Sequence, residues 1–66
     1  MMRRGIIHAW LQPGVFVRHP NQPDWGLGQV QSVDGMRATV GFEHRGKMLI
    51  NLAVVALEPA EPDEAR

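Results

Sequence analysis

The sequence contains no cysteine and no tyrosine, and its 66 residues carry as many acidic as basic side chains (7 Asp+Glu, 7 Lys+Arg). The lack of cysteine excludes disulfides and thiolate metal sites and fits a reducing compartment. A formal net charge of +0 argues against a general polyanion binder. A chain of this length forms one domain, which buries only about 60% of the surface that the unfolded chain exposes.

Long hydrophobic runs are also missing. The longest apolar-leaning segments, 6–11 and 49–57, are far shorter than the roughly 20 residues that a membrane-spanning helix needs. Arg3 and Arg4 precede a short apolar segment, as at the start of a signal peptide, but His8 interrupts it and no cleavage site follows. We therefore expect a cytoplasmic protein.

Charge is distributed unevenly along the chain. Residues 1–47 carry six basic and three acidic side chains, whereas the segment from Glu58 carries four acidic residues against Arg66. That segment also contains Pro59 and Pro62 and few apolar residues. It is therefore interpreted as a disordered, solubilising tail.

Apolar residues alternate with polar ones over short segments, which is the pattern of β-strands. The strands are expected at 15–19, 26–33, 36–43 and 47–52, with a 3₁₀ turn in 53–57 before a fifth short strand. We therefore predict an all-β fold, a small SH3-like (Tudor-like) antiparallel barrel of four to five strands. Its predicted parts are 1–13, an N-terminal arm or short helical turn; 14–57, the barrel; and 58–66, the acidic tail.

Turn-forming residues mark the corners of this predicted barrel. Pro20 and Pro23 end the first strand, and the glycines at 26 and 28 indicate a bulge or sharp bend. Asp34-Gly35 is the strongest hairpin signal and predicts a type I′ turn. In the strand that follows, the residues expected to face the core are Met36, Ala38, Val40 and Phe42.

These motifs occur in an order that resembles a known family. The pattern is G-x-x-V-R-H-P, a loop, an aromatic residue with G-x-G-x-V, then T-V-x-F, G-K and A-x-V-x-L. It resembles the C-terminal Tudor-like domain of bacterial DNA-repair helicases. It is still more similar to small stand-alone bacterial proteins of unknown function that carry H-P-x-x-P-x-W-G-x-G-Q-V. The matching residues are Gly14, 17–20, 25–26, Gly28, Val30, 39–40, Phe42, 46–47 and 53–57.

The helicase resemblance implies an SH3-like barrel that docks on RNA polymerase, and the RNA-polymerase-interacting domain of the transcription-repair coupling factor is similar in architecture. Two features depart from the helicase pattern. We expect no helicase to be attached to this chain, and its loop at 21–24 is longer, with Trp25 where the helicase domains often have phenylalanine. A changed loop is consistent with a changed partner.

Trp25 is the main candidate for a binding residue, because tryptophans beside a loop glycine often anchor interfaces. The competing interpretation is that the Trp25 ring folds back and caps the barrel, and the sequence leaves both open. Trp10 is expected to pack against the core. We expect a protein-binding module that docks on transcription or DNA-repair machinery through Trp25 and an open strand edge. A structural subunit of a larger assembly is a third interpretation.

The alternative function is nucleic-acid binding through a basic face with interleaved aromatic residues. Ordinary solvated charge is the competing interpretation of those basic residues. The face would be formed by Arg18, Arg37, Arg45 and Lys47, together with Phe16 and Trp25. The complete set of candidate partner-binding residues is Phe16, Arg18, His19, Asp24, Trp25, Arg37, His44, Arg45 and Lys47.

No residue pattern indicates catalysis, and neither a metal nor a cofactor is expected. His8, His19 and His44 lack metal-binding spacing, and His19 is expected to hydrogen-bond the loop backbone. Ser32 has no nucleophile-elbow context, and the G-x-G at 26–28 is no phosphate-binding loop. With four aromatic residues in all, a methyl-lysine cage is not expected either.

Overall fold

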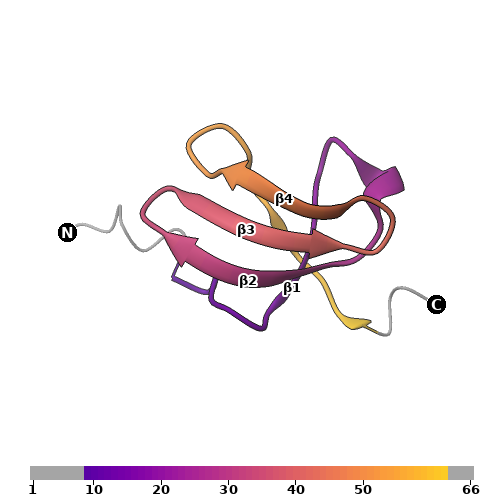
Figure 1. Cartoon of the computed structure of the whole chain (residues 1–66), viewed down its shortest axis with the longest axis horizontal. Helices are drawn as coiled ribbons and strands as arrows, with labels where there is room; N and C mark the ends of the chain where they lie inside the picture. The colour runs from indigo at the N-terminus through magenta and orange to yellow at the C-terminus, as the bar shows by residue number, and fades with distance from the viewer. Residues whose placement is uncertain (1–8, 63–66) are drawn as a thin grey trace.

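The protein folds as a single antiparallel sheet, shown in Figure 1 by a computed structural model that describes residues 9–62. The elements in chain order are β1 (Phe16–Arg18), the 3₁₀ helix η2 (Pro23–Trp25), β2 (Gly28–Asp34), β3 (Arg37–Phe42), β4 (Gly46–Asn51) and β5 (Glu58–Pro59). The strands lie in the order β4-β3-β2-β1-β5. The all-β prediction is confirmed. None of the helices in residues 9–62 is long and apolar enough to cross a bilayer.

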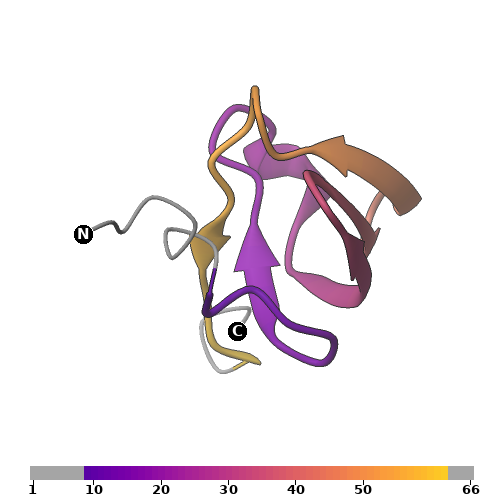
Figure 2. The same ribbon diagram turned by 90° about the vertical axis from the view of Figure 1, so that its left-hand side faces the viewer.

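The sheet curls without closing. Figure 2 shows β1 and β5 side by side, with β3 and β4 on the other side of the curl. The outer strands of the sheet are β4 and β5, which do not pair with each other. The described strands therefore form a curved open sheet, and the closed SH3-like barrel stays a prediction.

The β2–β3 hairpin differs by one residue from its predicted turn. Asp34 pairs with Arg37, so the two central residues of the turn are Gly35 and Met36. Gly35 has φ 63, and no non-glycine residue within 9–62 has a positive φ. A glycine with positive φ at the first central position is typical of a type II′ turn, whereas type I′ needs positive φ at both positions. Met36 is 48% exposed in this turn, so the prediction that it faces the core was wrong.

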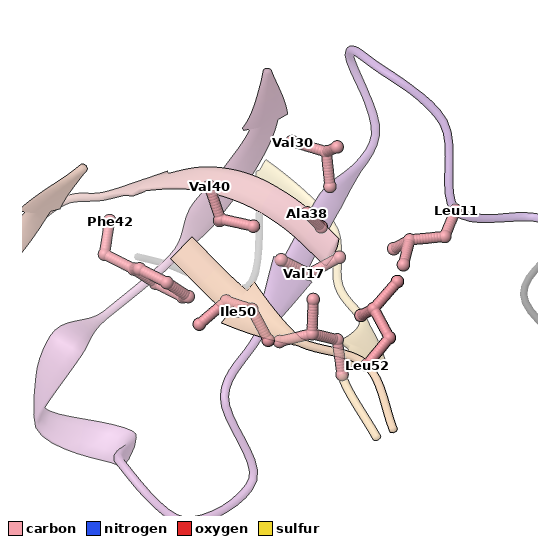
Figure 3. Packing of buried hydrophobic residues seen from close by; sticks show 9 residues of the cluster. Leu11, Val17, Val30, Ala38, Val40, Phe42, Ile50 and Leu52 are labelled. Carbon is pink, nitrogen blue, oxygen red and sulfur yellow. The ribbon is translucent and has the colours of Figure 1, made fainter. Parts of the chain in front are cut away.

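The alternating pattern of β3 builds the centre of the core. Ala38, Val40 and Phe42 are buried, as predicted, and Val40 is fully buried. Figure 3 shows how side chains from several elements meet around them. The buried cluster consists of Leu11, Val17, Val30, Ala38, Val40, Phe42, Ile50, Leu52 and Leu57. Trp10 packs against it, in agreement with its predicted role.

The bulge in β2 lies further along the chain than the predicted bend at the glycines 26 and 28. The register between β2 and β3 shifts between Val30 and Ser32, which places the bulge at Gln31. Gly26 lies outside the strand, directly after η2, and Gly28 is the first residue of β2. A Cβ on Gly28 would come within 2.7 Å of the Phe42 and Val40 side chains. Gly28 is therefore required by close packing rather than by a bend.

Both ends of the described chain pack on the sheet. Leu11 is 4% exposed, so the end of the predicted N-terminal arm joins the core. Glu58 and Pro59 form β5, which pairs with β1, and Ala60 N–H donates to the Phe16 carbonyl at 3.0 Å. The predicted acidic tail therefore begins inside the sheet. The possible helical turn before residue 9 and the tail beyond residue 62 lie outside the described residues.

We predict that Phe42→Ala unfolds most molecules, because truncating a buried phenylalanine costs about 3–5 kcal/mol and a domain of this size has a stability of only a few kcal/mol. Met36→Ala is the matched control, since an exposed turn side chain changes stability by about 0.5 kcal/mol or less. Urea unfolding followed by circular dichroism measures both. Equal midpoints would show that β3 does not face the core as described.

We also predict that truncation lowers stability only when it removes β5. A chain ending at Leu57 loses β5 and its bonds to β1, which costs about 1–3 kcal/mol for a few hydrogen bonds. A chain ending at Pro62 keeps β5 and should match the parent within about 0.5 kcal/mol. Thermal melting of the three chains tests this, and a chain ending at Leu57 that melts with the parent would show that β5 adds nothing.

Candidate partner-binding site

The loop after β1 and the β3–β4 turn meet at one end of the sheet (Figure 1). Three hydrogen bonds join them. His44 N–H donates to the Trp25 carbonyl at 3.0 Å, Glu43 N–H donates to the Leu27 carbonyl at 2.9 Å, and Leu27 N–H donates to Glu43 Oε1 at 3.1 Å. The loop that carries Trp25 is therefore fixed to the sheet. We call this region, formed by His19, η2 and residues 42–45, the Trp25 end.

Three rings pack together at the Trp25 end. The Trp25 ring lies edge-on to both of the others, with centroid distances of 4.9 Å to His19 and 5.2 Å to Phe42. His19 and Phe42 are 6.5 Å apart. Edge-to-face pairs at such distances are attractive beyond their buried area. Because Phe42 belongs to the core cluster, this stack connects Trp25 directly to the core.

His19 supports the loop as the sequence predicted. It is 8% exposed, and its Nδ1 accepts a hydrogen bond from Asn21 N–H at 3.1 Å. His19 therefore acts as a structural support behind Trp25 and offers little surface to a partner.

The remaining face of Trp25 is partly exposed and carries a cation. The Arg45 guanidinium lies 5.5 Å from the Trp25 ring centroid, within the range of a cation–π interaction. The sequence left two alternatives for Trp25, a cap on the core or an interface anchor. The ring contacts the core on one side and reaches the surface on the other, so its geometry is compatible with both roles.

Gly26 allows the close approach of the loop to the β3–β4 turn. Its φ is +79, and a Cβ at this position would lie 2.7 Å from His44 Cδ2 and 2.9 Å from Glu43 Oε1. The Trp-Gly pair is thus explained by packing against the turn. Glu43 was not among the candidate residues, because its bond to Leu27 joins positions sixteen residues apart and no local pattern signals it.

The structure divides the predicted basic face. Arg45 belongs to the Trp25 end and Lys47 follows two residues later in β4, whereas Arg37 begins β3 at its opposite end, about 17 Å away along a six-residue strand. Arg18, on β1, is the cross-strand partner of Glu58. The four basic residues therefore do not form one continuous surface.

The other candidates fall into two places. Asp24 and His44 are exposed beside Trp25, in η2 and in the β3–β4 turn. Phe16 lies on β1, partly exposed and opposite Gln29 of β2, on the face of the sheet that points away from the core. The structure thus brings together His19, Asp24, Trp25, His44 and Arg45, and it leaves Phe16, Arg18, Arg37 and Lys47 outside the Trp25 end.

Within residues 9–62 there is no pocket, and no three His, Asp or Glu side chains gather where they could hold a metal ion. His8 lies outside that range. A partner of the described part of the chain would therefore contact side chains on the exposed faces and edges of the sheet.

A family model for proteins of unknown function, DUF3553, matches residues 11–60. The chain belongs to the DUF3553 family. No curated protein and no solved structure matches it. The match extends beyond the 14–57 segment of the helicase resemblance, which these comparisons do not test. In this DUF3553 domain the family boundaries coincide with the first buried leucine, Leu11, and with Ala60, the last residue bonded to β1.

For the DUF3553 domain we predict that Gly26→Ala is far more destabilising than Gly46→Ala. Both glycines have positive φ, +79 and +83, where a side chain strains the backbone by about 1–3 kcal/mol, and the ψ of −161 places Gly26 in a region that essentially only glycine adopts. Nothing lies within 4 Å of a Cβ at Gly46, whereas at Gly26 the turn must move, which adds about 1–3 kcal/mol. Chemical unfolding of both variants measures the difference, and equal losses would rule out the close contact.

Proposed function

We propose that this DUF3553 domain is a non-enzymatic protein-binding module of the cytoplasm whose contact surface is the Trp25 end. The observation that carries the proposal is the state of the Trp25 side chain. Its ring is held by His19 and Phe42, lies under the Arg45 guanidinium and is still partly exposed. Tryptophan and arginine are among the residue types most enriched among those that dominate binding energy.

A fixed ring favours binding because little freedom remains to be lost. Immobilising a mobile side chain at an interface costs about 0.5–1.5 kcal/mol. Trp25 is already oriented by two ring contacts, and its own carbonyl accepts a hydrogen bond from His44 N–H. The loop thus presents a large apolar side chain whose position is set before a partner arrives.

Charged side chains lie next to Trp25. Asp24, the residue before it, is exposed, and the Arg45 guanidinium lies over the ring. Such rim charges steer an approaching partner and select its orientation more than they add affinity. The partner expected from this arrangement is a protein surface with an apolar recess for the Trp25 ring.

The resemblance to the Tudor-like domain of DNA-repair helicases suggests which partner to test first. We infer a component of the transcription or DNA-repair machinery, with RNA polymerase as the first candidate. The curved five-stranded antiparallel sheet is compatible with the SH3-like barrel of that resemblance. The open strand edge, which also entered the prediction, is a surface separate from the Trp25 end.

Nucleic-acid binding is the alternative function. Arg45 lies over the Trp25 ring, and a stacking site for a single strand requires such a pairing of a cation with an aromatic ring. The separation of Arg37 and the position of Arg18 opposite Glu58 leave only a small basic surface for a phosphate backbone. This favours the protein-binding proposal.

We predict that Trp25→Ala weakens partner binding at least roughly thirtyfold, the effect of losing an anchor worth 2 kcal/mol or more. Because Trp25 also contacts Phe42, the variant must be compared at a temperature where circular dichroism shows it folded. Arg45→Ala keeps the core contacts and should reduce affinity less. Binding to purified RNA polymerase, or to a partner isolated with the full chain, is measured by titration calorimetry.

Arg37→Ala is the matched control, because it removes an exposed arginine at the far end of β3 and should leave affinity unchanged. The nucleic-acid alternative predicts instead that affinity falls steeply with salt and with every arginine removed. If folded Trp25→Ala binds the partner as tightly as the parent, the Trp25 end is not the contact surface.

A further inference from the structure

Strand β4 forms the only long edge of the described sheet. The opposite edge, β5, has two residues, one of which is Pro59, and proline lacks the N–H that a further strand would need. Strand β4 has six residues with neither proline nor bulge, and no described strand lies on its outer side. Such an edge is a template for pairing with another strand.

One hydrogen bond identifies which backbone groups of β4 face outward. Leu52 N–H donates to the Met36 carbonyl at 2.7 Å, so the residues of β4 that bond to β3 are those in step with Leu52. Hydrogen-bonded and non-hydrogen-bonded pairs alternate in an antiparallel ladder, and β3 and β4 pair without a shift. The N–H and C=O groups of Lys47, Leu49 and Asn51 therefore point away from β3.

The Asn51 carbonyl is already used. It accepts hydrogen bonds from Val54 N–H at 3.0 Å and from Val55 N–H at 2.9 Å, which confirms that it points away from β3. The outward groups of Lys47 and Leu49 and the outward N–H of Asn51 have no such partner within residues 9–62. At the middle of this edge, the Leu49 side chain is 64% exposed.

We propose that β4 pairs antiparallel with β4 of a second copy of this chain, around a two-fold axis at Leu49. In this register the two Leu49 residues exchange both of their backbone hydrogen bonds, and each Asn51 N–H donates to Lys47 of the partner, which gives about four bonds between the chains. The two exposed Leu49 side chains become cross-strand neighbours.

Charge favours this register over the one that pairs the two lysines. It places Lys47 opposite the neutral Asn51 of the second copy and separates the two lysines by four residues, about 14 Å. A register that set Lys47 against Lys47 would put like charges directly opposite each other, which is destabilising. The edge of β4 carries no acidic residue, so no attraction between unlike charges competes for another register. The Trp25 end is not part of this interface, so the inference does not depend on the proposed function.

The first test is the mass of the full chain by sedimentation equilibrium, at concentrations up to about 1 mM, where weak association is still detected. The parent chain should approach twice its monomer mass. Leu49→Pro removes one outward N–H and leaves every bond to β3, and Leu49→Lys puts two charges opposite each other. Each should raise the dimer dissociation constant at least tenfold.

Met36→Lys is the matched control, because it places the same charge at another exposed apolar residue, in the β2–β3 turn. It should dimerise like the parent. Circular dichroism establishes whether each variant is folded. If Leu49→Pro does not fold, the dimer dissociation constant of Leu49→Lys alone tests the proposal. A parent chain that stays monomeric at every concentration, or a dimer that both Leu49 variants retain, would overturn the proposal.

A second test determines the register of the two paired strands by disulfide cross-linking. Because the chain has no cysteine of its own, one introduced cysteine can cross-link only to its copy in the second chain. Opposite residues in a hydrogen-bonded pair have Cα atoms about 5.5 Å apart, a distance that a disulfide spans. Leu49→Cys should therefore form a covalent dimer rapidly under a mild oxidant. Lys47→Cys should not, because its two copies lie about 14 Å apart. Equal cross-linking of the two variants would exclude the pairing around Leu49.

Discussion

The fold depends on how a small curved sheet closes its core with residues that lie outside its strands. The buried residues within the strands that build the core are valine, alanine, phenylalanine or isoleucine: Val17, Val30, Ala38, Val40, Phe42 and Ile50. Every buried leucine in the described chain lies in a connection: Leu11, Leu27, Leu52 and Leu57. Valine, isoleucine and phenylalanine are residue types that pleated strands favour. The connections are therefore as necessary to the core as the strands.

This constraint explains why the two ends of the sheet differ. At the Trp25 end, Leu27 is buried, and its backbone N–H and carbonyl both bond to Glu43. Once Leu27 is fixed in this way, the preceding residues Trp25 and Gly26 lie against the β3–β4 turn. The position of the Trp25 ring is thus a consequence of core closure. A surface that depends on the core in this way has a fixed shape, which suits binding to one particular partner.

Local periodicity in the sequence was sufficient to predict the regular strands. Alternation identified β3 and its three buried residues. The prediction that Met36 faces the core was wrong. Met36 continues the alternation of the strand, but the structure places it in the turn next to Gly35, outside the strand. A fifth short strand after residue 57 was expected and is present as β5, but its glutamate and proline were assigned to the tail because a strand of two residues has no period to detect.

The sequence predicted which types of residue form the candidate site. It predicted less well which of these residues lie next to one another. A tryptophan on a proline-bounded loop and a histidine that bonds the loop backbone could both be expected from the sequence. The partnership of Trp25 with Arg45 could not, because it depends on the long-range contact between η2 and the β3–β4 turn. The basic face was overestimated for the same reason. Basic residues were assigned to one surface by their charge, whereas strand register separates Arg37 from Arg45 and sets Arg18 opposite Glu58.

The two surfaces proposed for this domain are connected through a single turn, since Arg45 of the Trp25 end is followed directly by Gly46, the first residue of β4. In a dimer centred on Leu49, the two copies of Arg45 would lie on opposite sides of the axis, about 27 Å apart along the paired strands. Both Trp25 rings would remain outside the interface. Such a dimer presents two identical contact surfaces at a fixed separation, and a partner with repeated sites would bind it more tightly than it binds one copy without any new kind of contact.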